Sequence, residues 1–109
     1  MIGDLIDVMG DEFTDLVRVY LEDTPKAVAL LEQAAVRGQR DGIIAPSHSL
    51  KSTSANLGAI RLSEIAKRLE HGARSGDLGG EAVALVNELK REYQQVAVAL
   101  NELIAKERA

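Results

Sequence analysis

The sequence predicts an all-α protein, specifically an antiparallel four-helix bundle with a short extra N-terminal helix. Of its 109 residues, 46% are hydrophobic but only 3% are aromatic, so the core must be aliphatic. Apolar residues recur every three or four positions along most of the chain, which is the period of an amphipathic helix. Alanine, leucine, glutamate and arginine are abundant and there are only two prolines, so the intrinsic preference is also helical.

The N-terminal third is predicted to contain a short helix and two longer helical segments. Residues 2–9 form the short helix, which Gly10 ends. Asp11 is the expected N-cap of the next segment. The pair Thr24-Pro25 predicts a new helix start, because threonine is a favoured N-cap and proline a favoured first helical residue. The expected inward faces consist of Phe13, Leu16, Val17 and Tyr20, and of Val28, Leu31 and Ala35.

The next predicted helix begins after the loop 38–40, with Asp41 as its cap, and stops at Gly58. Pro46 removes one backbone hydrogen bond inside this pattern. Either the helix bends at Pro46, or its regular part begins there. In the second case Ile44 need not lie on the same side of the helix as His48. The inward stripe consists of Ile43, Leu50, Ser54 and Leu57.

Two further helices complete the predicted bundle. One starts at Arg61 and is followed by a glycine-rich turn over 75–80. The last runs from Glu81 to about Lys106 without glycine or proline. Their expected inward faces consist of Leu62, Ile65, Ala66, Leu69 and Ala73, and of Ala82, Val86, Leu89, Tyr93, Val96, Leu100 and Leu103. Helices with one apolar face and short connections are best buried as an antiparallel bundle, here a single domain over 1–109.

His48 is the residue that stands out chemically. On a helix it projects about 160° away from Leu50 and Leu57, hence toward solvent. Lys51 lies one turn further on, and the other neighbours on this side are Ile44 and the short side chains of Ser52 and Ala55. A neutral imidazole is a nucleophile near pH 7. A phosphoryl group on it would add close to two negative charges, which a lysine one turn away can compensate.

The run from His48 through Leu50, Lys51 and Ser52 to Gly58 and Ala59 resembles the signature of histidine-containing phosphotransfer (HPt) domains. These are helical-bundle intermediates of bacterial multistep phosphorelays. The family has a lysine three residues after its phosphorylated histidine, as here, and usually a glycine where this chain has Ser52. Weaker similarity extends from Phe13 through residues 21–25 to Leu69, Arg74 and the loop 75–77.

This resemblance implies a phosphoryl carrier without kinase activity. His48 would accept the group from an aspartyl phosphate, most readily at Nε2, and Lys51 would compensate its charge. Ile44, Ser52 and Ala55 would form the docking surface. The implied partners are response-regulator receiver domains and a hybrid sensor kinase. No cofactor is expected on this chain, because the receiver would supply Mg²⁺.

Composition and motifs argue against several other classes of protein. A net charge of −4 argues against a nucleic-acid surface, and the lack of cysteine removes disulfides and thiolate sites. No apolar run reaches the ~18 residues of a membrane span and no signal-peptide layout opens the chain, so we expect a cytoplasmic protein. We also expect it to be a monomer. Neither histidine has a glutamate three residues before it, as the Glu-x-x-His pairs of a di-iron bundle require, and the chain has no glycine-rich nucleotide loop that would suggest an autokinase. An adaptor or scaffold bundle, in which His48 is incidental, remains the alternative, and His71 is expected to be an exposed histidine without a role.

Overall fold

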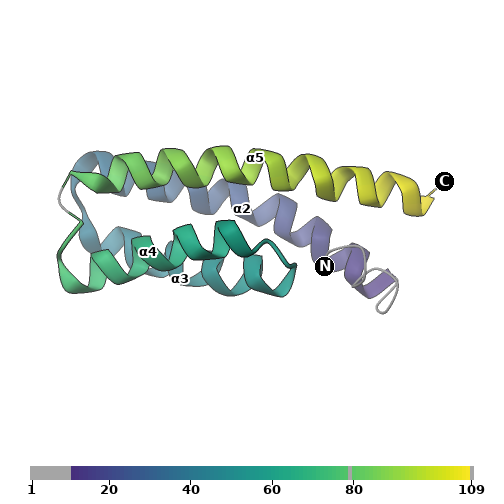
Figure 1. Cartoon of the computed structure of the whole chain (residues 1–109), viewed down its shortest axis with the longest axis horizontal. Helices are drawn as coiled ribbons and strands as arrows, with labels where there is room; N and C mark the ends of the chain where they lie inside the picture. Colours follow the sequence, from purple (N-terminus) through teal and green to yellow (C-terminus); the bar gives the residue numbers. More distant parts are fainter. Residues whose placement is uncertain (1–10, 79, 109) are drawn as a thin grey trace.

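The computed structural model describes residues 11–78 and 80–108, which form four helices. The helices are α2 (Asp11–Arg37), α3 (Arg40–Asn56), α4 (Ile60–Ser75) and α5 (Glu81–Arg108). Each runs antiparallel to the one before it (Figure 1). This confirms the predicted four-helix bundle. The predicted short helix over 2–9 lies outside the described residues.

The four helices pack in a ring in which α3 contacts α2 and α4, and α5 contacts the same two helices. The long helices α2 and α5 extend beyond the shorter pair α3 and α4, so the molecule measures 46 × 18 × 17 Å (Figure 1). The main core fills the part where all four helices overlap. A second cluster closes the end beside the α3–α4 turn and comprises Phe13, Val17, Tyr20, Leu57 and Leu100.

The predicted helix start at Thr24-Pro25 is wrong, because α2 continues through Pro25 to Arg37. Thr24 is 2% exposed and belongs to the interior rather than to an exposed helix end. Proline has no N–H to bond the carbonyl of Leu21, four residues earlier. The Tyr93 hydroxyl of α5 instead donates to that carbonyl over 3.4 Å. A contact from a distant part of the chain thus compensates the local break.

Two smaller predictions on α2 and α3 are also wrong. Leu16 is 41% exposed, because Phe13, Val17 and Tyr20 already fill the inward stripe of α2 and Leu16 lies beside it. Asp41 is not the cap of α3: Gln39 holds that position, without a side-chain hydrogen bond, and Asp41 lies in the first turn. An acid there still interacts favourably with the helix dipole. The other predicted inward residues are buried or partly buried.

The turn after α3 fixes where α4 begins. Gly58 has a φ of +80°, which only glycine adopts without strain. The amide of Ala59 donates to the carbonyl of Ser54 at 2.9 Å, and that of Gly58 to Ala55 at 3.0 Å. These two hydrogen bonds form a Schellman motif, so the predicted stop at Gly58 is confirmed.

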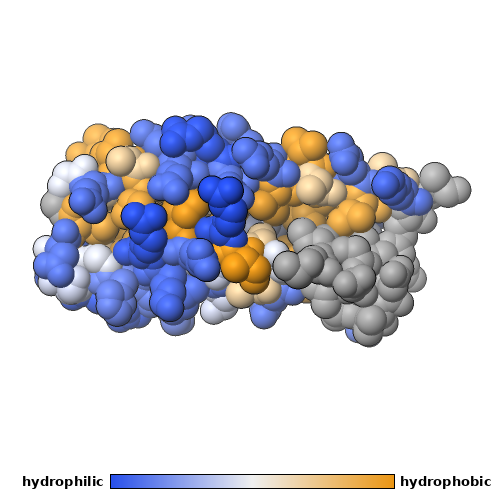
Figure 2. Space-filling view, in the orientation of Figure 1, coloured by the Kyte–Doolittle hydropathy of each residue, from blue (hydrophilic) through white to orange (hydrophobic). Residues whose placement is uncertain are grey.

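The face formed by α4 and α5 carries a strip of hydrophobic residues with hydrophilic residues on both sides (Figure 2). His71 lines a shallow groove on this face and is exposed, as predicted. No helix within residues 11–78 and 80–108 is long and apolar enough to cross a membrane.

Candidate functional site

Helix α3 presents His48 to solvent because its other side is anchored in the core. Ile43, Leu50 and Leu57 are between 1% and 3% exposed, whereas the His48 side chain is 58% exposed. The helix is continuous through Pro46, which excludes a start at that residue and keeps Ile44 in phase with His48. The buried Ser47 hydroxyl donates to the carbonyl of Ile43 at 2.6 Å.

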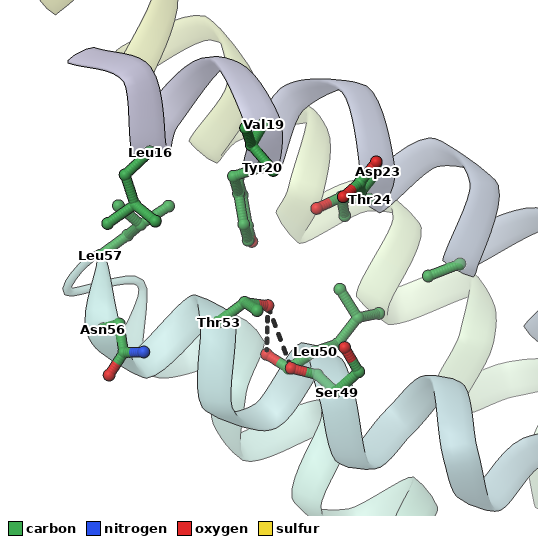
Figure 3. Close-up of a pocket in the computed structure, with 11 residues that line it drawn as sticks. Leu16, Val19, Tyr20, Asp23, Thr24, Ser49, Leu50, Thr53, Asn56 and Leu57 are labelled. Atoms are coloured by element: carbon green, nitrogen blue, oxygen red, sulfur yellow. Dashed lines mark hydrogen bonds between the residues drawn. The ribbon is translucent and has the colours of Figure 1, made fainter. Parts of the chain in front are cut away.

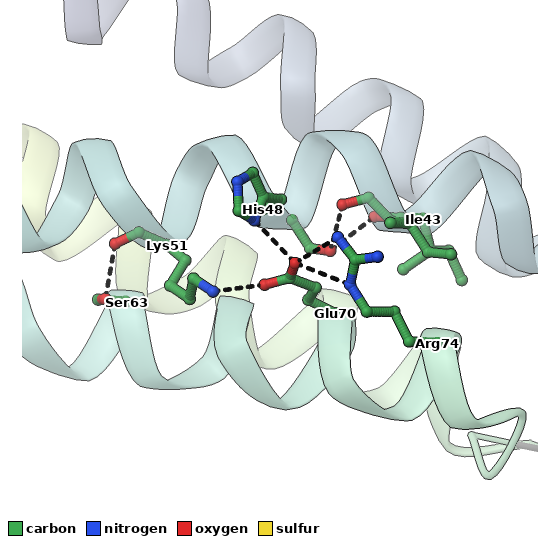
Figure 4. A network of polar contacts seen from close by, with 8 residues as sticks. Ile43, His48, Lys51, Ser63, Glu70 and Arg74 are labelled. Atoms are coloured by element: carbon green, nitrogen blue, oxygen red, sulfur yellow. Dashed lines mark hydrogen bonds and ion pairs between the residues drawn. The ribbon is translucent and has the colours of Figure 1, made fainter.

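Helix α4 brings a carboxylate, Glu70, directly under His48. Glu70 Oε2 lies 2.7 Å from His48 Nδ1, and Oε1 lies 2.7 Å from Lys51 Nζ (Figure 4). Arg74, one turn further along α4, donates to Oε2 from Nε at 3.0 Å and from its terminal nitrogen at 2.9 Å. Each carboxylate oxygen therefore has at least one charged or ring-nitrogen partner. The Glu70 side chain itself is only 7% exposed.

These partners keep Glu70 ionised. Its hydrogen bond with Lys51, followed by those with Arg74 and His48, lowers the pKa of the carboxyl from 4.5 to about 2, although burial opposes the shift. An ionised carboxylate has no proton to donate, so Nδ1 of His48 must be the donor in the 2.7 Å contact. In the neutral imidazole the lone pair is then on Nε2. The nitrogen that extends furthest from the backbone is thereby the nucleophilic one.

Lys51 lies one turn from His48, as the sequence predicts, but its ammonium is bound to Glu70 rather than free. Its side chain is 33% exposed. The Ser63 hydroxyl of α4 donates to the Lys51 backbone carbonyl at 2.7 Å, which ties the two helices together beside the site. Lys51 is thus within reach of a group on His48 while neutralised by a neighbouring carboxylate.

Most of the side chains next to His48 on α3 are short. Ser52 and Ala55 are exposed, and Ile44 is partly buried against the core. On the other side of α3 an apolar groove of about 120 Å³ runs between α2 and α3 (Figure 3). Leu16 and Val19 of α2 line it opposite Ser49, Thr53 and other residues of α3. The imidazole therefore lies between an apolar groove and the charged edge of α4.

The sequence reasoning missed Glu70, although Arg74 formed part of the family resemblance. Glu70 follows the inward residue Leu69 directly and is spaced four residues before Arg74. An acid adjoining an apolar stripe, with a cation at i+4, was the available signal. Its pairing with α3 depends on how the two helices pack, which the sequence of α4 alone does not specify.

No group of three or more histidine or carboxylate side chains able to hold a metal ion occurs in the described part of the chain. At the site, one buried carboxylate already pairs with two cations and a histidine.

An exposed imidazole beside a lysine and an arginine on a helical bundle is the arrangement expected in a phosphotransfer protein. Comparison with known proteins agrees with this class. The family model described as "Hpt domain" matches residues 15–99, so the chain belongs to the Hpt domain family. Its members are histidine phosphotransfer carriers of phosphorelays, not kinases, and their partners are receiver domains.

A solved structure supports the same assignment. The chain resembles histidine-containing phosphotransfer protein B (HptB) from Pseudomonas aeruginosa PAO1, with 31% sequence identity and a TM-score of 0.84. The match covers 93% of this chain and 87% of that one. No curated protein sequence matches the chain. The predicted fold class, family and phosphorelay function are thereby confirmed.

Proposed function

We propose that His48 is the residue that carries the phosphoryl group, and that it does so on Nε2. The observation that supports this most is the 2.7 Å contact of Nδ1 with ionised Glu70, because it leaves the Nε2 lone pair facing solvent. His71, the other histidine, lacks such a contact among the described side-chain pairs and lies on the α4–α5 face. It is not part of the proposed reaction.

In the proposed reaction, the Nε2 lone pair attacks the phosphorus of a receiver's aspartyl phosphate. The N–P bond forms while the P–O bond to the aspartate breaks, and its electron pair leaves on the aspartate carboxylate. A second receiver's aspartate then attacks the same phosphorus. The Nε2–P bond breaks and the electron pair returns to the ring. Mg²⁺ on the receiver would lower the charge repulsion between the two anionic groups.

Lys51 would turn from Glu70 toward the phosphoryl oxygens once the group is on His48. Lysine has a flexible side chain, and its ammonium binds phosphate as a point charge. Arg74, whose side chain is 56% exposed, can follow the same route from the α4 side. Together the two cations would offset the charge of nearly −2 that a phosphoryl group brings.

The receiver would dock over α3, with Ile44, Ser52 and Ala55 at the point of closest approach. Short side chains there allow the reacting atoms to come within roughly 3–3.5 Å. The apolar groove beside Leu16 and Val19 would bury part of the partner's surface. We further propose that residues 1–109 form one monomeric cytoplasmic domain whose partners include a hybrid sensor kinase. It would neither bind ATP nor phosphorylate itself.

The central test uses His48→Gln with His71→Gln as the matched control, since both histidines are exposed. Each protein is incubated with a receiver domain that has been phosphorylated by acetyl phosphate. We expect a label in the wild type and in His71→Gln that is lost in acid and survives base, as a P–N bond does, and none in His48→Gln. Because His48→Gln also removes the 2.7 Å hydrogen bond to Glu70, circular dichroism checks that this variant is folded. Transfer to folded His48→Gln would contradict the assignment.

Lys51→Ala tests the charge compensation. Loss of a charge-assisted contact of about 1.5 kcal/mol corresponds to roughly ten-fold slower transfer, without abolition. Lys90→Ala is the matched control, because it removes a lysine that pairs with Glu32 on a different face, at 3.4 Å. An unchanged rate in Lys51→Ala would remove Lys51 from the mechanism.

A further inference from the structure

Ser52 carries a hydroxyl group next to His48 that is free to bind an incoming group. It lies one turn after His48 on α3, and its side chain is exposed. A helical serine or threonine often donates to a carbonyl about one turn earlier, as Ser47 and Thr53 of the same helix do. Ser52 makes no such hydrogen bond, and no other, within residues 11–78 and 80–108. Its hydroxyl is therefore available to a group on His48.

The orientation of the His48 ring decides where such a group would lie. The two nitrogens of an imidazole point in nearly opposite directions, and Nδ1 is directed at Glu70 of α4, 2.7 Å away. Nε2 consequently points away from α4, as the ring nitrogen that is not bonded to Glu70 does in Figure 4. A phosphoryl group on Nε2 would thus extend over the part of the α3 surface that faces away from α4.

Helix geometry places Ser52 on this same side of the ring. At about 100° per residue, Lys51 projects about 60° to one side of His48 and Ser52 about 40° to the other side. The Lys51 side is the α4 side, because Lys51 Nζ contacts Glu70 there at 2.7 Å. Side chains on a helix lean toward its N-terminus, so Ser52 leans toward His48. The hydroxyl therefore lies on the side to which Nε2 points.

We propose that the Ser52 hydroxyl donates a hydrogen bond to a phosphoryl oxygen on His48, which makes Ser52 a further phosphoryl-binding residue. This inference rests on the proposed function of His48. The group has three acceptor oxygens. Lys51 and Arg74 approach them from the α4 side, and Ser52 approaches them from the other side. A hydrogen bond to an ionised oxygen is stronger than one between neutral groups, and this one forms only when His48 is phosphorylated. It therefore stabilises the phosphorylated state.

This role differs from a docking role in what it changes. A residue that only contacts the receiver changes the rates of transfer in both directions by the same factor, because the receiver is free before and after the reaction. The equilibrium constant of transfer then stays the same. A hydrogen bond to the phosphoryl group instead shifts this constant toward phosphorylated His48. The equilibrium constant thus separates phosphoryl binding by Ser52 from docking over Ser52.

The test compares the wild type with Ser52→Ala, which removes only the hydroxyl and has the better helix propensity. Ser75→Ala is the matched control, an exposed serine at the far end of α4. Each full-length protein is mixed with a purified phosphorylated receiver domain, and the label on both proteins is measured at equilibrium. We expect the constant for transfer to His48 to be about five-fold lower in Ser52→Ala, the effect of one hydrogen bond, and unchanged in Ser75→Ala. A constant in Ser52→Ala equal to that of the wild type would overturn the inference, even if transfer were slower.

A second measurement needs no receiver. Both serine variants are made in the His71→Gln protein, so that phosphoramidate labels His48 alone, and the ³¹P chemical shift is followed between pH 5 and 9. A donor to the phosphoryl oxygens favours their ionised form, so Ser52→Ala should raise the pKa of the phosphoryl group. An unchanged pKa would also overturn the inference. Failure of a phosphorylated receiver to label wild-type His48 would instead overturn the proposed function, so the two failures are distinguishable.

Discussion

Lowering the pH is expected to destabilise the bundle through the titration of Glu70. The folded protein holds the pKa of this carboxyl at about 2, against 4.5 for the unperturbed group. A carboxyl whose pKa is depressed by folding stabilises the folded state above its unfolded pKa. That contribution is fully present above pH 4.5 and is lost as the pH falls from about 4.5 toward 2.

The structure sets the size of this effect. A shift of one pKa unit corresponds to about 1.4 kcal/mol, so the full shift would bound the contribution at roughly 3.5 kcal/mol. Solvent screens part of it, because the His48, Lys51 and Arg74 side chains are 58%, 33% and 56% exposed. We therefore expect Glu70 to contribute about 1–2 kcal/mol to the free energy of unfolding at pH 7.

The assay is urea unfolding of the wild type, Glu70→Gln and Glu64→Gln at pH values from 2 to 7. The other carboxyls titrate in every one of these proteins, so the difference between wild type and Glu70→Gln isolates one group. This difference should be largest at pH 6–7 and should shrink as the pH falls below 4.5. A difference between wild type and Glu70→Gln that stays constant across the range would refute the reasoning, as would an equal pH dependence in the Glu64→Gln comparison.

Two further predictions concern the hydrogen bond between α2 and α3 and the packing beside the α4–α5 turn. Tyr20 and Ser54 share a buried 2.8 Å hydrogen bond between α2 and α3, so Tyr20→Phe should lower the free energy of unfolding by about 1–2 kcal/mol. A double-mutant cycle with Ser54→Ala should give a coupling near 1 kcal/mol, and additive effects would show that the bond contributes nothing. A Cβ on Gly72 would lie 2.7 Å from Leu78 Cδ2 and 2.8 Å from its Cγ, so Gly72→Ala should cost about 1–2 kcal/mol despite better helix propensity. Gly80→Ala, where a Cβ meets open space, is the control, and equal thermal midpoints of the two variants would contradict the overpacking argument.

Much of the architecture follows from features that act over one or two turns of helix. The three- and four-residue spacing of apolar side chains places Leu50 and Leu57 inside and His48 outside, because a helix turns by a fixed angle per residue. Gly58 ends α3 because it alone adopts the left-handed backbone conformation there without strain. The position of Lys51 one turn from His48 has the same origin. The candidate phosphoacceptor was therefore predictable from the sequence.

Other features of the fold and the site depend on the tertiary structure, through contacts between helices that lie far apart in the chain. The sequence around Pro25 favours a helix start, yet α2 is continuous because packing buries Thr24 and brings Tyr93 to the carbonyl that proline leaves without a donor. Glu70 becomes the partner of His48 because α4 packs against α3 in one register, although 22 residues separate the two. Local sequence determines the direction in which a side chain leaves its own helix, whereas the side chain that it meets there is determined by the packing of whole helices.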